Sequence, residues 1–333
     1  MSLFIAALLL SFCMRSANAS SVREAAARHR TFLKRFLYPP ASASDMSEKE
    51  RVHSVNKNAI YNFLHTYYRF STSALMQYSA GQLHPFELQD EVEDVKLLHP
   101  NFLKRRGTSY VYEMAPDDVP RARLAELMRC REVLRGTINN NPKFNCFGLH
   151  EWAMLYSGGE GSSPRERHQK HTSLRVSQAV VDEVVESSSL KCTHFDAFRF
   201  FHTSAQPMNS PSHLTRQGQA SSEQAGCIHS HMDLFKYAYT LYPLVSSDLL
   251  QSALYLALRA RTVDMAASPY EVGALVDEAN TIFKPEERVC SFYAVESVEG
   301  RKLYMAEQER LWMASKPVRN EILAAYECAL KNV

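Results

Sequence analysis

The stretch GCIHSHMDLFKYAYTLYP, residues 226–243, decides the fold of this 333-residue chain and contains its densest group of reactive side chains. From His229 to Tyr242 it has the composition of a buried helix, which Pro243 ends because proline cannot continue a helix. Ser246 and the two residues after it then supply capping side chains for a second helix, predicted to reach about Arg261. Two consecutive helices of this kind indicate a helix-rich fold.

The first of these helices has two polar faces. His229 and Asp233 are four residues apart, so they share one face of the helix. His231, two residues after His229, points in a different direction. We therefore expect His229 and Asp233 to belong to one site and His231 to lie outside it.

Two earlier segments have the same mixture of cysteine, histidine and carboxylate: CFGLHE at residues 146–151 and CTHFD at residues 192–196. The first is predicted to lie on a short helix at 148–156. The second begins a stretch, 192–201, in which side chains alternate, and alternation predicts a strand. On a strand His194 and Asp196 would share a face. Asp264 precedes a Ser-Pro-Tyr sequence that is typical of a turn, from which it could face the same site or act as a cap.

The rest of the chain is predicted to be mainly helical. Helices are expected at 24–37, from 47, and at 59–70, 121–134 and 307–330, with short strands at 110–112, 293–295 and 303–304. Residues 176–186 could form either a strand or a helix, and 158–171 and 202–226 are predicted loops. The predicted class is α+β: a helix-rich single globular domain over residues 20–333, with short strands and its candidate active site within 146–270.

Composition narrows the possible functions. The chain is 45% hydrophobic and 22% charged, as expected of a globular protein, and its net charge of +2 gives no electrostatic argument for nucleic-acid binding. Seven cysteines without CxxC spacing predict reduced thiols, without a disulfide framework or a zinc site of paired cysteines.

The N-terminus resembles a targeting segment. Residues 3–12 are apolar and are followed by Ala17-Asn18-Ala19, a small-residue cleavage pattern. We expect residues 1–19 to direct the chain to the secretory pathway or an organelle; a docked N-terminal helix in a cytoplasmic protein is the alternative. The apolar run is too short to span a bilayer, and no transmembrane anchor is expected in the mature chain.

The three reactive segments predict a metal-dependent site. Imidazole and carboxylate groups bind transition metals and transfer protons, and two histidines with one carboxylate form a familiar iron-binding set. A transition metal, iron or zinc, is expected as the cofactor, with ligands His150, His194, Asp196 and His229. The expected catalytic residues are Glu151, Asp196 and Asp233, and the expected cofactor-binding residues are Trp152, Arg199 and Asp264. Buried hydrogen-bond networks, or acid–base chemistry without a metal, would explain the same residues.

Five blocks of the chain also resemble a known family. They are residues 62–71, CFGLHEWAM at 146–154, CTHFDAFRFF at 192–201, GCIHSHMDL at 226–234 and DMAASPY at 264–270. These blocks are similar to those of a bacterial and algal family labelled 3-methyladenine DNA glycosylase. The resemblance implies hydrolysis of the N-glycosidic bond of an alkylated base, without a metal, with Asp196 or Glu151 as the activating carboxylate. Trp152 and residues 198–201 would then hold the base, and DNA would be the partner.

Three functions follow as expectations. The first is a metal-dependent, non-haem-iron-like oxidoreductase or hydrolase acting on a small molecule. The alternative is the DNA glycosylase that the resemblance implies. The third is a non-catalytic binding protein in which the histidine clusters are structural.

Overall fold

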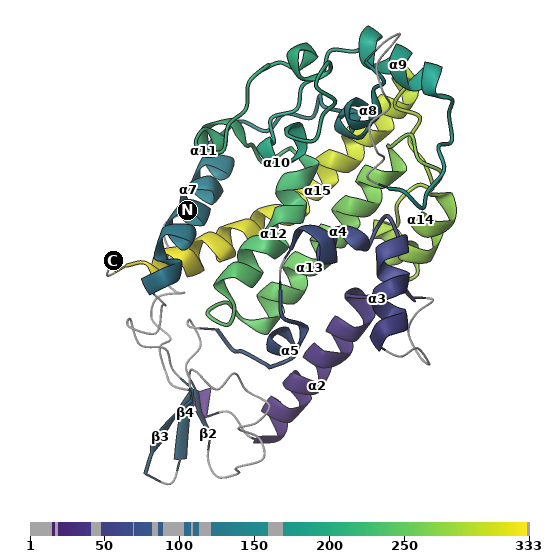
Figure 1. Cartoon of the computed structure of the whole chain (residues 1–333). Coiled ribbons are helices and arrows are strands. Elements are labelled where there is room, and N and C mark those ends of the chain that lie inside the picture. Colours follow the sequence, from purple (N-terminus) through teal and green to yellow (C-terminus); the bar gives the residue numbers. More distant parts are fainter. Residues whose placement is uncertain are drawn as a thin grey trace.

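The computed structural model describes residues 15–16, 19–40, 48–68, 70–81, 86–88, 103–107, 109–112, 121–158 and 169–331 (Figure 1). Its helices and short 3-10 turns (η) are α2 (Ala19–Phe36), α3 (Glu48–Lys57), α4 (Asn62–Tyr67), α5 (Thr72–Leu75), η4 (Arg121–Arg123), α7 (Leu124–Asn139), α8 (Leu149–Leu155), α9 (Gln178–Ser187), α10 (Phe195–Phe198), η5 (Gln206–Met208), α11 (Gln219–Ser222), α12 (Ile228–Leu241), α13 (Ser247–Ala266), α14 (Gly273–Asn280), η6 (Pro285–Glu287) and α15 (Val298–Ala329). Its strands are β1 (Arg15–Ser16), β2 (Phe86–Leu88), β3 (Leu103–Arg106) and β4 (Ser109–Tyr112). The described chain is therefore mostly helical, as predicted, with a few short strands; the predicted α+β class is not confirmed.

Helices α12, α13 and α15 form the centre of the fold. α12 packs along α13 and against α15, and α13 also contacts α15. Around them, α7 packs on α15 and α12, and α2 packs on α13. In Figure 1 the yellow α15 runs across most of the molecule with the green α12 and α13 beside it. Nearly every side chain of α13 is buried, which makes it the core helix.

Capping serines begin the two longest central helices. Ser246 accepts a hydrogen bond from the backbone N–H of Leu249 at 3.1 Å, as the sequence predicts. Ser297 does the same for Gly300 at 3.0 Å, so α15 begins earlier than expected. Gly300 must be glycine here, because a Cβ would lie 2.0 Å from the carbonyl oxygen of Ala294.

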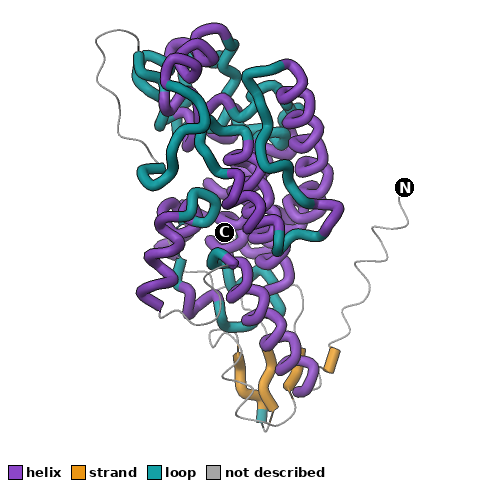
Figure 2. The backbone as a smooth tube through the Cα atoms, turned by 90° about the vertical axis from the view of Figure 1, so that its right-hand side faces the viewer, coloured by secondary structure: helices purple, strands orange, loops and turns teal. Residues whose placement is uncertain are grey.

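The strands form one small sheet at an end of the molecule (Figure 2). Its order is β1-β2-β4-β3, with β4 antiparallel to both β2 and β3 and β1 parallel to β2. β4 confirms the strand predicted at 110–112. None of the pocket-lining residues described below comes from this sheet.

Several predicted elements are wrong. Residues 192–201 form no strand; α10 occupies the middle of this stretch, and its backbone bonds are local, from Ala197 and Phe198 to the carbonyl of His194. Residues 293–295 lie outside the described strands, and 303–304 lie within α15. A strand requires a partner, and these segments pack among helices instead. Residues 176–186 resolve as helix α9.

The hydrophobic core is continuous from Val22 on α2 to Leu330 after α15. No helix in the described ranges is both long enough and apolar enough to cross a bilayer. Most of the predicted targeting segment, residues 1–14 and 17–18, lies outside the described residues, as does the core of the predicted loop at 159–168.

Candidate functional site

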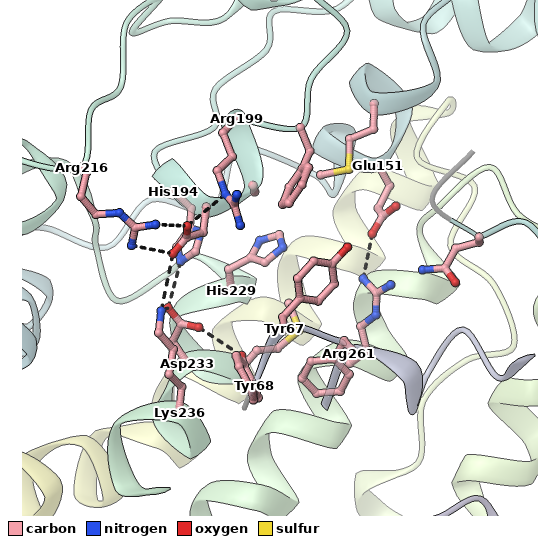
Figure 3. A pocket seen from close by; sticks show the side chains of 17 residues that line it. Tyr67, Tyr68, Glu151, His194, Arg199, Arg216, His229, Asp233, Lys236 and Arg261 are labelled. Carbon is pink, nitrogen blue, oxygen red and sulfur yellow. Dashed lines mark hydrogen bonds and ion pairs between the residues drawn. The ribbon is translucent and has the colours of Figure 1, made fainter. Parts of the chain in front are cut away.

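A cavity of about 240 Å³ opens beside the central helices (Figure 3). The sequence segments that approach it include α4, α8, α10, α12 and α13. Its histidines are His194 and His229; its carboxylates are Glu151, Asp196 and Asp233; its cations are Arg199, Arg216, Lys236 and Arg261; its aromatic side chains are Phe63, Tyr67, Tyr68 and Phe200. The three reactive segments of the sequence therefore converge at one place, although they are far apart along the chain.

Among the described residues, two groups of three side chains could hold a metal ion, and in each the ligand atoms lie within 4.8 Å of one another. We call His150, His229 and Asp264 the clamped triad. We call His194, Glu223 and Asp233 the spaced triad. The clamped triad has two histidines and one carboxylate, and the spaced triad has one histidine and two carboxylates; they also differ in geometry and in access to the cavity.

In the clamped triad the ligand atoms are already engaged with one another. His150 Nε2 lies 2.7 Å from Asp264 Oδ1, the length of a charged hydrogen bond. The other oxygen of Asp264 accepts from Arg261 at 2.8 Å, and Arg261 also donates to Glu151 at 2.7 Å. All four of these side chains are buried. The Asp264 carboxylate is therefore engaged on both sides, by His150 through Oδ1 and by Arg261 through Oδ2.

In the clamped triad, the negative charge of Asp264 is balanced by a proton on His150. Burial alone would lower the pKa of His150, but the Asp264 carboxylate raises it to about 10. Burial would raise the pKa of Asp264, yet His150, His229 and Arg261 hold it well below its usual range. At neutral pH the pair is an imidazolium and a carboxylate. Asp264 lies in the last turn of α13, so the expectation that it stands in a turn is wrong.

The spaced triad has longer separations. His194 Nε2 lies 3.3 Å from Asp233 Oδ2 and 3.4 Å from Glu223 Oε1. These are long for charged hydrogen bonds, which are typically about 2.7–2.9 Å. With metal–ligand bonds of about 2.1 Å, neighbouring ligand atoms lie about 3.0–3.4 Å apart in octahedral or tetrahedral geometry. The two separations from His194 are in the range of neighbouring ligands around an ion, and the third pair, Glu223 and Asp233, lies within 4.8 Å.

Local structure fixes each member of the spaced triad. His194 is the residue before α10, and Glu223 is the residue after α11, where it accepts from Gln219 Nε2 at 2.6 Å. Asp233, on α12, accepts from the Tyr68 hydroxyl at 3.1 Å and from Lys236 Nζ at 3.3 Å. Such contacts behind ligand residues are typical of metal sites because they orient the donor atoms.

The two carboxylates of the spaced triad differ in pKa. Burial raises the pKa of Glu223, and the nearby Asp233 carboxylate raises it further. Burial would also raise the pKa of Asp233, but Lys236 and His194 hold it well below its usual range. Two buried carboxylates in contact with one imidazole thus favour an added positive charge, which either a proton or a metal ion can provide.

His229 connects the two triads. Its ring stacks on that of His194, with centroids 4.9 Å apart and planes 21° apart, and contacts His150 edge-on at 4.4 Å. It lies near the centre of the residues in Figure 3. Burial, together with the positive charge of His150, lowers its pKa well below the ordinary value, so it is neutral at pH 7. Its Nδ1 is buried and has no hydrogen-bond partner among the described residues.

Asp196, expected to be a metal ligand, belongs to neither triad. It accepts from Arg216 at 2.8 Å and pairs with Arg199 Nε at 3.1 Å and Lys236 Nζ at 3.5 Å. Burial would raise its pKa, but Lys236 and the other nearby cations lower it. The strand geometry that predicted a shared ligand face for His194 and Asp196 is absent, because α10 turns them apart.

Trp152 and His231 lie behind the site. Trp152 is fully buried and donates from Nε1 to the carbonyl of Ala267 at 2.9 Å, outside the cavity lining. His231 contacts Arg319 on α15 at 3.2 Å. It is buried away from His229 and Asp233, as its helical position predicts. Of the other two predicted cofactor contacts, Arg199 lines the cavity and Asp264 does not.

Sequence reasoning missed several residues of this site, among them the polar side chains of Tyr68, Arg216, Glu223, Lys236 and Arg261. Lys236 was recognisable, since it is three residues after Asp233 and shares its helix face. Glu223 lies in the long predicted loop at 202–226, a length that is often functional. The six cysteines in the described part of the chain are free thiols, and Cys146, Cys192 and Cys227 are buried near the histidines they accompany.

No family model, no curated protein and no solved structure matches the chain. The argument for function therefore depends on the geometry of the site.

Proposed function

We propose that this protein is a metal-dependent enzyme acting on a small molecule, with the metal bound by His194, Glu223 and Asp233. The observation that carries the proposal is the spacing of the spaced triad, 3.3 and 3.4 Å from His194 Nε2 to the two carboxylates. A purely structural ion pair would be expected to close to about 2.8 Å, as His150 and Asp264 do.

One imidazole and two carboxylates suit iron, zinc or manganese, and iron and zinc are the ions proposed here. Three protein ligands leave coordination positions for water or substrate. His194 and Asp233 line the cavity, so those positions are accessible from it. When bound, such an ion supplies Lewis acidity and lowers the pKa of a bound water.

The chain's own residues then have distinct tasks. Tyr68 and Lys236 hold Asp233 in position through its two oxygens. His229, neutral and lining the cavity beside His194, orients the reacting group through a hydrogen bond. Asp233, predicted as catalytic, is proposed here as a ligand.

Glu151 and Asp196 shape the cavity walls that would face the substrate. Glu151 is joined to Arg261 at 2.7 Å and gives one end of the cavity a paired polar surface. Asp196 orients the cations around it. Neither carboxylate needs to bind the metal in this arrangement.

A second candidate is the glycosylase implied by the resemblance. The observation favouring it is that Glu151 and Asp196 face a cavity with aromatic walls, where a flat base could stack. It ranks second because both carboxylates are already hydrogen-bonded to arginines, so their oxygens are engaged with the protein instead of with a water. A non-catalytic binding protein is the third reading, in which both triads are only structural.

Metal content tests the proposal. The full chain is expressed in iron- or zinc-supplemented medium, purified, and assayed by elemental analysis beside Glu223→Gln and Glu186→Gln. Glu186 is an exposed carboxylate that bonds Tyr156, so it controls for loss of charge. We expect close to one ion per chain in the natural protein and the control, and almost none in Glu223→Gln.

Absence of metal from all three proteins would overturn the proposal and make release of alkylated bases from DNA the next assay. Retention of full metal content in Glu223→Gln would show that the spaced triad is not the binding site.

A further inference from the structure

The cavity wall around Asp196 contains more positive than negative charge. Arg199, Arg216 and Lys236 all contact this one carboxylate. Lys236 is also paired with Asp233 at 3.3 Å, so three cations face two carboxylates. At least one positive charge on this wall is therefore not neutralised by the cavity's own acids.

The two arginines are accessible to a ligand. Their side chains are 45% and 44% exposed for Arg199 and Arg216. Arg199 contacts Asp196 through Nε at 3.1 Å. Arg216 donates to Asp196 from both Nη groups, at 2.8 and 3.3 Å, and each of these groups keeps a second N–H for a ligand. A guanidinium binds an oxyanion best through two parallel N–H groups, which the Nη groups can offer.

Beside these cations the wall is aromatic. The Arg199 guanidinium lies over the Phe200 ring, 4.2 Å from its centroid, and the Tyr67 ring is 5.8 Å from Phe200. Phe63 and Met154 extend this apolar lining. A cavity of about 150 Å³ accommodates benzene, so the 240 Å³ here has room for a substituted or fused ring.

We propose that the substrate is a planar aromatic carboxylate, whose acid group binds Arg199 and Arg216 while its ring packs against Phe200 and Tyr67. The inference rests on the proposed function, since it takes this cavity as the substrate site. Binding places the ring between the arginines at the cavity entrance and the spaced triad further in.

A set of matched ligands can separate the contribution of the carboxylate charge to binding from that of the aromatic ring. The probe is 2-naphthoate, compared with neutral 2-naphthamide and with acetate, titrated calorimetrically into metal-free and metal-loaded full-length protein. We expect 2-naphthoate to bind at least about tenfold more tightly than 2-naphthamide, because a charged arginine contact is lost in the amide. Acetate is expected to bind more weakly still, because it lacks the ring.

Variants locate the contact. Arg199→Gln and Arg216→Gln should each weaken 2-naphthoate binding by about tenfold and leave 2-naphthamide binding unchanged. Arg288→Gln, at an exposed arginine after η6 outside the cavity lining, should leave both unchanged. Circular dichroism confirms that each variant is folded.

Equal binding of 2-naphthoate and 2-naphthamide, or no binding of either, would overturn the inference, as would an effect of Arg288→Gln equal to that of the cavity arginines. Failure of this inference can be told apart from failure of the proposed metal site. Metal bound without 2-naphthoate binding refutes the substrate class alone, whereas 2-naphthoate binding to a protein that takes up no metal refutes the proposed function alone.

Discussion

The two triads use almost the same side chains but differ in what surrounds them. In the clamped triad Arg261 bridges Glu151 and Asp264, and the histidine–carboxylate contact has closed to 2.7 Å. In the spaced triad the nearest cation, Lys236, contacts only one of the two carboxylates, and the histidine contacts remain at 3.3 and 3.4 Å. Each triad has one carboxylate paired with a permanent cation, so the length of the histidine–carboxylate contact is what distinguishes them: 2.7 Å in the clamped triad against 3.3 and 3.4 Å in the spaced triad.

The largest effect is expected from removing the clamp. Arg261→Met leaves Glu151 and Asp264 buried without their cation, and breaking a buried pair in this way costs about 3–5 kcal/mol of unfolding free energy. Urea denaturation measures it, with Arg288→Met as an exposed control. A loss below about 1 kcal/mol, the value of a surface pair, would mean that the clamp does not stabilise the fold.

The metal affinities of two histidine variants should show which triad binds the ion. His194→Gln removes one of three ligands and should weaken metal binding by more than about 100-fold, beyond the loss seen for residues that only support ligands. His150→Gln, which alters the clamped triad, should bind metal as the natural protein does. Competition with a coloured chelator measures both. The opposite order would assign the metal to the clamped triad.

Because of the clamped triad, the free energy of unfolding should fall as the pH becomes alkaline. The pKa of His150 is raised to about 10 in the folded chain from 6.5 in the unfolded chain, so the folded state holds a proton between these values that the unfolded state releases. This stabilisation is complete below pH 6.5 and is lost as pH rises through 10, with a fall of about 2–3 kcal/mol between pH 7 and 9.

Denaturation at a series of pH values measures this dependence. Asp264→Asn, which removes the partner carboxylate, should flatten the profile in this window. An equally steep profile in that variant would assign the pH dependence to another group.

The smallest effect is expected at Trp152. Trp152→Phe removes the hydrogen bond to Ala267 and leaves a small cavity, at a cost of about 1–2 kcal/mol. Because Trp152 lies outside the cavity lining, 2-naphthoate affinity should not change. Thermal unfolding and titration give the two values. A change in affinity with unchanged stability would instead support the cofactor contact expected from the sequence.

The positions of the two central helices and the faces of their histidines were predictable from the sequence. Caps and proline positions located α12 and α13, and helical spacing separated His231 from His229 and Asp233. Those rules work because they concern neighbours on one helix. The sequence also indicated that the three reactive segments meet, since each contains the same rare combination of groups.

Other parts of the site depend on contacts between distant segments. Whether Asp196 binds a metal or an arginine depends on Arg216, which lies on a separate loop. Glu223 reaches His194 only because α11 ends where it does. The alternation at 192–201 suggested a strand, but a strand also needs a partner, which a single segment cannot reveal.

The distances along the chain between partners have a consequence for how the protein folds. Tyr68 and Asp233 are 165 residues apart, His150 and Asp264 are 114, and Arg261 reaches the carbonyl of Ala59 across 202. Chain segments of that length must be closed into loops before these groups meet, and contacts of high sequence separation slow folding. Individual helices can form early without bringing any of these partners together. We therefore expect the pocket to form late in folding. A chain that ends before α13 lacks Arg261 and Asp264, and so has neither the clamp nor a complete cavity.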